Sequence, residues 1–211
     1  PHYFLRKHNS WTLVSSGTFS ARYFNDGFLL DTASNCFYFD DKDDVIWKYS
    51  LGLLNSKITD AVLSILNPTL NFSCGVVGLI PFKRDSIEQI NKLVTENLEF
   101  SKNDWDSREL SWNFMLNELV RIKGQDLEES YELYQKHWQT KFCKLHKNEE
   151  KLNRYFIKIY GLSNDLTPQI ELENVTILME ELECSSMEKL NKKLFRDSNT
   201  YEVQNYHEIT L

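Results

Sequence analysis

The sequence predicts an α+β fold, with a β-rich module and its packed helices followed by a long-helix region. Two observations carry this prediction. Near the start of the chain, aromatic and β-branched segments are separated by turn residues, which is typical of short strands. From residue 45 onward, apolar residues recur every three or four positions, which is typical of amphipathic helices.

Residues 1–40 read as short strands. The segments "WTLVSSGTFSARYF" and "GFLLDTASNCFYFD" are rich in aromatic and β-branched residues, with Gly17, Gly27 and Asn25-Asp26 as turn signals. A polar loop follows at residues 40–44. Its last residue, Asp44, is a predicted N-cap for the next helix.

A single helix is predicted from Val45 to Leu66. Five apolar residues form one buried stripe along it: Leu51, Leu54, Ile58, Val62 and Ile65. Asn67-Pro68 should stop this helix, because the residue before a proline avoids the α region.

The stretch "ILNPTLNF" invites comparison with the Asn-Pro-Pro-aromatic loop of amino-methylating DNA methyltransferases. Asn67-Pro68 begins that pattern, but Thr69-Leu70 does not complete it, and no glycine-rich segment precedes it. We therefore interpret Asn67-Pro68 as a helix stop, with Leu70 and Phe72 packing back on the helix.

After this stop the sequence predicts one or two short strands in "NFSCGVVGLIPF", bending at Gly75 and Gly78. A second helix is expected over residues 87–100, capped by Asp85-Ser86. The segment "NDWDSRELSWNF" reads as an irregular aromatic connection whose Trp105 and Trp112 pack into a core.

A long helix is predicted from Asp126 to Tyr160, ended by Gly161 as the C′ residue. Its apolar stripe consists of Leu127, Tyr131, Tyr134, Trp138, Phe142, Leu145, Leu152, Phe156 and Ile159. A strand is expected over residues 169–179 and a short helix over residues 185–195. The predicted domains are residues 1–102, an aromatic connection over 103–125, and a helical spacer over 126–211.

Composition indicates an ordinary globular protein, since 41% of residues are hydrophobic and 13% are aromatic. No apolar run reaches the roughly 20 residues of a membrane span. The four cysteines are spread too evenly for a zinc site or a disulfide framework, so reduced, mostly buried thiols in a cytoplasmic protein are expected. A net charge of −7 argues against nucleic-acid binding by bulk electrostatics.

The sequence contains no phosphate-binding, nucleotide-binding or metalloprotease motif. His137 and His146 point to different sides of the long helix, so no metal site is expected. The acidic pairs Glu128-Glu129 and Glu149-Glu150 are predicted to be solvated. Because the chain starts at Pro1 without a signal-peptide pattern, we expect a fragment of a longer protein.

Four blocks in consistent order resemble the PglX-type adenine-specific DNA methyltransferases of BREX phage-defence systems, which are related to the Taq-type enzymes. The blocks are "WTLVSSGTFSARYFNDGFLLDTA", "LGLLNSKITDAVLSILNPTLNFSCGVVGLIPF", "NDWDSRELSWNF" and "NEEKLNRYFIKIYGLSNDLTPQI". The tail from residue 180 onward does not match, and we assign it no role.

This resemblance implies the C-terminal, target-recognition part of an adenine-N6-specific DNA methyltransferase, with double-stranded DNA as partner. The fragment would be non-catalytic and would hold no cofactor. S-adenosylmethionine would bind to the upstream methyltransferase domain of the same chain, which would flip the target adenine out of the duplex. Other defence-system proteins are further possible partners.

Candidate DNA-binding residues are polar or basic and lie in predicted loops and on a polar helix face. Hydroxyls beside a flexible glycine suit a phosphate, and arginine suits a phosphate or a guanine edge. The candidates are Ser15, Ser16, Thr18, Ser20, Arg22, Asn55, Lys57, Lys83 and Arg84. For Asn55, bracing of a neighbouring loop is the alternative.

Two other functions stay open. The chain could be the recognition domain of a restriction enzyme or of a specificity subunit, with a different catalytic partner. It could also be a protein-interaction module of a defence complex, because the long aromatic-faced helix and the acidic charge would suit docking.

Overall fold

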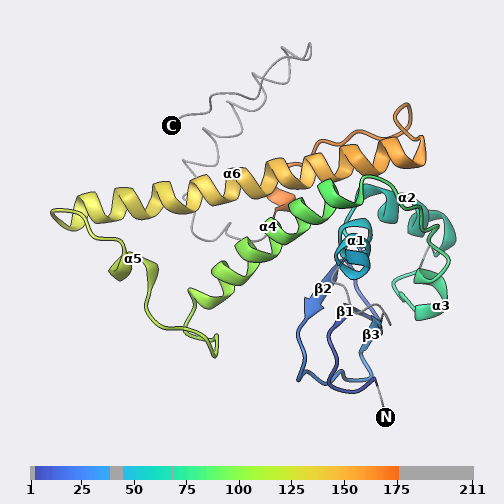
Figure 1. Cartoon of the computed structure of the whole chain (residues 1–211), viewed down its shortest axis with the longest axis horizontal. Helices are drawn as coiled ribbons and strands as arrows, with labels where there is room; N and C mark the ends of the chain where they lie inside the picture. Colours follow the sequence, from blue (N-terminus) through green and yellow to red (C-terminus); the bar gives the residue numbers. More distant parts are fainter. Residues whose placement is uncertain (1–2, 39–44, 68, 176–211) are drawn as a thin grey trace. The chain divides into compact units, whose positions relative to one another are not determined.

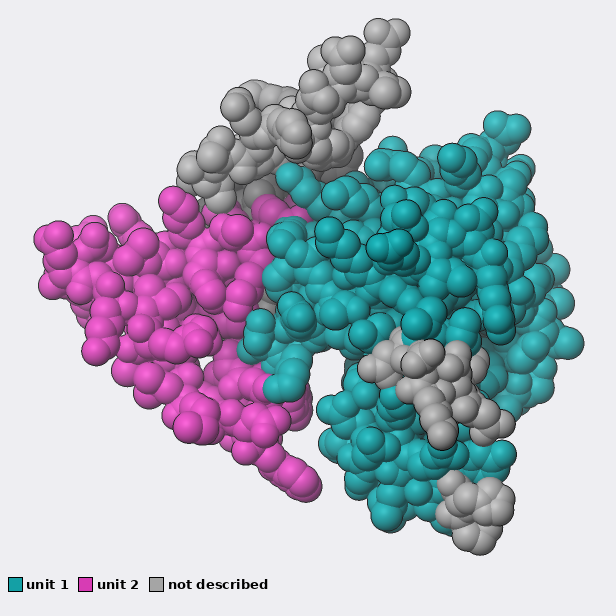
Figure 2. Space-filling model, in the orientation of Figure 1, with its two compact units in different colours: residues 1–103, 144–170 teal, residues 104–143, 171–211 magenta. Residues whose placement is uncertain are grey.

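A computed structural model describes residues 3–38, 45–67 and 69–175. The chain divides into two compact units (Figure 2). Unit 1 comprises residues 1–103 and 144–170, and unit 2 comprises residues 104–143 and 171–211. The predictions for Asp44, Pro68, Cys184 and the helix over 185–195 lie outside the described residues.

Unit 1 contains an antiparallel three-stranded sheet in the order β2-β1-β3 (Figure 1). Its strands are β1 (His8–Thr12), β2 (Ala21–Phe24) and β3 (Ser34–Phe37). Ser10 of the central strand pairs with Arg22 on one side and Cys36 on the other. Together with the helices described below, this sheet confirms the predicted α+β class.

Helix α1 (Val45–Leu54) packs on one face of the sheet. Asn9 in β1 donates from Nδ2 to the Trp47 carbonyl at 2.8 Å, and the Tyr23 ring stacks on Trp47 with centroids 4.1 Å apart. On the other side of α1, the Tyr49 ring meets the edge of Phe156 at 5.4 Å. Helix α1 is therefore the central layer of unit 1.

The single helix predicted over residues 45–66 is wrong. Two helices occupy this stretch, α1 and α2 (Lys57–Leu66), and Asn55-Ser56 separates them. The Ser56 and Thr59 hydroxyls both donate to the Leu53 carbonyl, at 2.7 Å each, and so bond the end of α1. Because the break redirects the chain, Ile65 is 81% exposed and does not join the predicted stripe.

The helix stop at Asn67 is confirmed, since α2 ends at Leu66 and Asn67 is its C-cap. Phe72 is buried as expected, but Leu70 is 57% exposed. The strands predicted in "NFSCGVVGLIPF" are wrong, because this segment contains only a bridge at Asn71 and a short helix, α3 (Cys74–Val77). Ser73 caps that helix by accepting from the Val76 N–H, an N-cap signal that favours helix over strand.

Helix α4 (Ile87–Asp106) begins where predicted but continues six residues beyond Phe100. The long helix α6 (Leu127–Tyr160) is confirmed. At its end Gly161 has φ of 75°, the Gly161 N–H donates to Lys158 and the Leu162 N–H donates to Ile157. This pair of bonds is the Schellman motif, which needs a residue able to adopt positive φ.

Apart from residues 104–106 of α4 and residues 127–143 of α6, the described part of unit 2 has little regular structure. Between them lies a series of turns and the short helix α5 (Glu118–Arg121). The described part of the strand predicted over residues 169–179 is a 3₁₀ turn, η1 (Leu172–Asn174), so that prediction is wrong there.

Two predictions about exposure are also wrong. Of the described cysteines, Cys36, Cys74 and Cys143 form no disulfide, but Cys74 is exposed and the other two are only half-buried. Glu149 and Glu150 are not simply solvated. Burial raises the pKa of Glu149 to about 7, and Glu150 accepts a hydrogen bond from the Ile170 N–H at 3.2 Å.

Candidate nucleic-acid interface

The loop between β1 and β2, residues 13–20, is held on both sides by backbone hydrogen bonds. Leu13 donates to Ala33 at 2.8 Å and accepts from Phe72 at 2.7 Å, while Ser15 donates to Leu70 at 3.0 Å. A loop anchored at several points presents its side chains in a defined geometry, which lowers the ordering cost of binding.

Aromatic packing fixes the second half of the same loop. Phe19 is 7% exposed, and its ring lies 5.8 Å from Trp11 and 5.3 Å from Phe72. The hydroxyl-bearing residues around it, Ser16, Thr18 and Ser20, are exposed, and Ser15 is half-buried. The buried phenylalanine therefore anchors a segment whose hydroxyls face solvent.

Arg22 lies on β2, immediately after this loop, and is exposed. Its neighbours point the other way, because Ala21 is buried and Tyr23 stacks on Trp47 in the α1 layer. Since side chains alternate along a strand, Arg22 projects from the sheet face that α1 does not cover. The structure thus brings Arg22 and the loop hydroxyls into one continuous segment of unit 1.

Asn55 clamps the strand that carries Arg22. Its Oδ1 accepts from the Ala21 N–H at 2.8 Å, and its Nδ2 donates to the Ala21 carbonyl at 2.9 Å and to the Leu51 carbonyl at 3.1 Å. The side-chain amide therefore satisfies both backbone groups of Ala21. This arrangement corresponds to the bracing alternative and makes Asn55 a positioning residue.

Lys57 is also engaged within unit 1. Its backbone N–H donates to Asn153 Oδ1 at 2.9 Å, and its ammonium donates to the Gln169 carbonyl. These bonds join the start of α2 to α6 and to the segment that follows α6. Contact of Lys57 with a phosphate stays a prediction, and it would require the ammonium to leave or share this carbonyl.

Lys83 and Arg84 are exposed, and two tyrosines hold the backbone at Lys83. The Tyr49 hydroxyl donates to the Lys83 carbonyl at 2.7 Å, and the Lys83 N–H donates to the Tyr160 hydroxyl at 3.3 Å. The Lys83 ammonium lies 5.2 Å from the centre of the Tyr160 ring. This basic pair stays a candidate, at a position fixed by α1 and α6.

The predicted burial of Trp105 and Trp112 is wrong. Trp105 is 54% exposed and Trp112 is 98% exposed. The turns that follow α4 bond to themselves, since the Ser111 hydroxyl donates to Asp106 Oδ1 at 2.7 Å and accepts from the Asn113 N–H at 3.1 Å. This local closure leaves the Trp112 ring in solvent.

Sequence reasoning missed a row of basic residues on α6, which we call the basic stripe. It consists of Lys144, Lys147, Lys151, Arg154 and Lys158. The steps of 3, 4, 3 and 4 residues are the signal that could have revealed it, because this spacing places all five on one helix face.

Within the described residues, no cluster of three or more histidine, cysteine or acidic side chains could hold a metal ion. Nor does any helix among them have the length and apolarity that a membrane crossing requires.

No protein-family model matches the chain. The chain is 34% identical over 173 residues to "Adenine-specific methyltransferase PglX" of Lacticaseibacillus casei (strain Zhang), an alignment covering 80% of this chain and 14% of that protein. It is 31% identical over 170 residues to "Adenine-specific methyltransferase BrxX" of Escherichia coli O9:H4 (strain HS), again covering 80% of this chain and 14% of that protein. The chain thus spans a small part of each relative, and the predicted resemblance to PglX-type methyltransferases is confirmed.

Proposed function

We propose that this chain, similar to one segment of PglX-type adenine-specific methyltransferases, is the DNA target-recognition part of such an enzyme in a phage-defence system. Methyl transfer to adenine N6 from S-adenosylmethionine would belong to another part of the longer protein. The chain itself would be non-catalytic and would bind no methyl donor.

One observation carries the recognition role: the anchored loop of residues 13–20 that leads into Arg22. Hydroxyls of Ser16, Thr18 and Ser20 suit phosphate oxygens, and such contacts fix the register of a protein on its duplex. Arg22 can donate two parallel hydrogen bonds to O6 and N7 of a guanine in the major groove. Asn55 supports this role by holding the backbone of β2 in place.

The test compares Arg22→Ala with Arg121→Ala, which removes the same charge from an exposed residue of unit 2. Target duplexes are first selected from a randomised pool with the wild-type 211-residue chain. For Arg22→Ala we expect about 10-fold or weaker binding to the selected duplex and a reduced preference over a scrambled one, since a good base contact contributes about 1–3 kcal/mol. Arg121→Ala should bind like the wild type.

A further variant, at Asn55, tests a residue that would position β2 without touching DNA. Asn55→Ala should weaken binding to the selected duplex and also lower the melting temperature, because it leaves the Ala21 backbone groups without partners. Equal binding by the wild type and Arg22→Ala to every duplex would contradict the recognition role. Binding of S-adenosylmethionine to the 211-residue chain in a calorimetric titration would contradict the absence of a methyl-donor site.

A second candidate function is docking of a protein of the same defence complex. It is favoured by the exposed large apolar side chains of unit 2, which include Trp112 and Met115. Capture of a purified defence component by the wild type, lost on Trp112→Ala with DNA binding unchanged, would support this alternative.

A further inference from the structure

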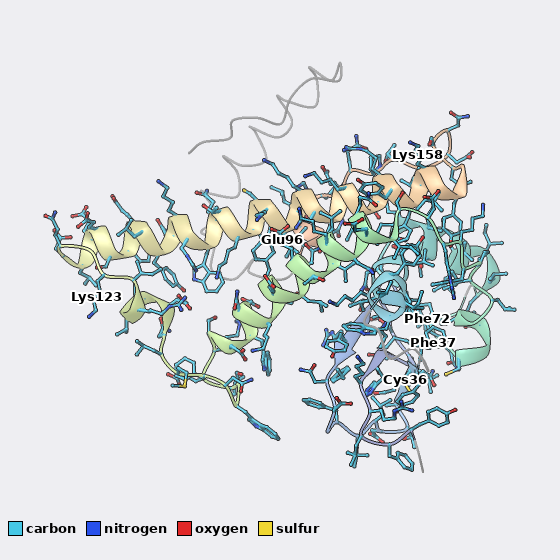
Figure 3. All side chains as sticks on the ribbon, viewed as in Figure 1. Cys36, Phe37, Phe72, Glu96, Lys123 and Lys158 are labelled. Atoms are coloured by element: carbon cyan, nitrogen blue, oxygen red, sulfur yellow. The ribbon has the colours of Figure 1, made fainter. Side chains whose placement is uncertain are left out.

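The basic stripe runs along the last four turns of α6. At 100° per residue, its five members fall within an arc of about 80° and extend over about 21 Å of helix. Lys147 is half-buried and the other four residues are exposed. In Figure 3 the labelled Lys158 lies on the side of α6 that faces away from α4.

The opposite side of this helix segment is apolar and packed. Leu145 and Phe156 are 1% and 0% exposed, and Phe156 meets Tyr49 of α1. Asn148 bonds both Glu96 and Asn97 of α4. Packing therefore fixes the rotation of α6 about its axis, so the basic stripe is presented in a single orientation.

One member of the stripe is neutralised within unit 1. The Lys144 ammonium pairs with Glu96. Burial raises the pKa of Glu96, but hydrogen bonds from Lys144 and Asn148 outweigh it, so this pKa lies below its ordinary value. In the described part of the chain, neither Arg154 nor Lys158 pairs with a carboxylate.

Of the two acidic residues in the same helix segment, one is largely buried and the other has partners outside the stripe. Glu149 is largely buried, with its pKa raised to about 7. Glu150 accepts from the Ile170 N–H and lies 3.7 Å from the His146 ring nitrogen. Within the stripe, Lys147 precedes Lys151 and Arg154 precedes Lys158 by four residues, and a like-charge pair at this spacing destabilises a helix by about 0.2–0.5 kcal/mol.

Helix stability does not explain this arrangement. The helix dipole favours cations only in the last turn, which accounts for Lys158 but not for Lys151 and Arg154. A solvated helix face normally alternates in sign, with acidic residues four positions before basic ones, whereas here only Arg154 has an acidic residue, Glu150, at that spacing. Arg154 and Lys158 thus carry positive charge that no carboxylate in the described residues neutralises, and a negatively charged partner would relieve it.

We propose that the basic stripe binds the phosphate backbone of duplex DNA, as a site separate from the loop that leads into Arg22. This inference rests on the proposed function, which gives the chain a DNA partner. Duplex DNA carries one negative charge per about 1.7 Å of axis, so a 21 Å row of cations faces many phosphates. The contact is independent of sequence and supplies affinity, whereas the loop supplies selectivity.

The composition of this surface favours DNA over an acidic protein. Protein interfaces are anchored by buried aromatic or aliphatic side chains. Of the large hydrophobic residues exposed in the described part of the chain, none lies in residues 144–160. A phosphate backbone needs no such anchor, because charge neutralisation and counterion release drive its binding.

The test is a double variant, Lys151→Gln with Lys158→Gln, compared with Lys123→Gln plus Lys136→Gln, which removes two exposed lysines from unit 2. Dissociation constants of the 211-residue chain are measured against salt concentration for a selected duplex and a scrambled one. Each lost phosphate contact lowers the slope of log K against log salt by about 0.9. We expect the stripe variant to lose about two such increments and to weaken equally on both duplexes. The control should match the wild type.

An unchanged salt slope in the stripe variant, with a wild-type melting curve, would overturn the proposal. So would a loss of preference between duplexes without a loss of general affinity, or a changed oligomeric state with DNA binding intact. The two proposals fail separately. If the wild type prefers no duplex, the recognition role fails, but a shallower slope in the stripe variant still supports the phosphate site.

Discussion

The two units differ most in charge. Unit 1 contains 15 basic and 14 acidic residues, whereas unit 2 contains 9 basic and 17 acidic residues. The net charge of −7 therefore arises in unit 2, and unit 1 is nearly balanced. The whole-chain charge is therefore a poor argument against DNA binding by unit 1.

The two units also differ in how many apolar residues they bury. Every residue of the main hydrophobic core belongs to unit 1. The described part of unit 2 buries Trp138, Phe142, Leu172 and Val175. It exposes a larger set of apolar side chains: Trp105, Leu110, Trp112, Met115, Leu116, Val120, Leu127, Tyr131 and Leu133. Most of the folding free energy should therefore reside in unit 1.

Of the variants that test this contrast in packing, Phe156→Ala should lose the most unfolding free energy. Phe156 is fully buried, and a Cβ added at Gly52 would lie 3.5 Å from its ring. Truncation leaves a cavity between α1 and α6 and should cost about 3–5 kcal/mol of unfolding free energy, measured by urea denaturation. A loss below about 1 kcal/mol would show that unit 1 does not depend on this core.

Long periodic segments were the most predictable part of the fold. The boundaries of α6 follow from its apolar spacing and from Gly161, and the presence of short strands in residues 1–40 follows from the β-branched and aromatic residues there. The break at Asn55 was not predictable, because its cause is a hydrogen-bond pair with Ala21, 34 residues away. Tertiary contacts of this kind leave no periodic signal in the sequence.

The sequence predicted which polar residues of the candidate site are exposed, but not the contacts that these residues make within the fold. The exposure of the hydroxyls and of Arg22 follows from their polarity in a segment that contains the flexible Gly17. The engagement of Lys57 with Gln169 does not, because those residues are 112 positions apart. Exposure of Trp112 was missed for the opposite reason, since large aromatic residues are usually assigned to cores and here local hydrogen bonds decide.

Glu149 makes the stability of unit 1 sensitive to pH. Burial raises its pKa in the folded chain to about 7, above the 4.5 of an ordinary glutamate. Its stabilising contribution is therefore fully present below about pH 4.5 and is lost as the pH rises through about 7. Glu149→Gln should remove this dependence and stabilise the chain by on the order of 2 kcal/mol at pH 8.

Melting curves of the wild type and Glu149→Gln between pH 5 and pH 8 would measure the effect. Glu128→Gln is the matched control, since Glu128 is exposed on the same helix and should leave the pH dependence unchanged. Parallel wild-type and Glu149→Gln curves across this range would mean that Glu149 ionises without a cost to folding.

Trp112→Ala should have the smallest effect. Because Trp112 is 98% exposed, removing its ring creates no cavity, and exposed substitutions usually change stability by less than about 0.5 kcal/mol. Urea denaturation monitored by circular dichroism measures this, because the other tryptophans would complicate a fluorescence readout. Together, Trp112→Ala and Phe156→Ala test whether unit 1 is well packed and unit 2 is not. A loss of more than about 1 kcal/mol would mean that unit 2 buries this ring in solution, and the contrast in packing between the two units would no longer hold.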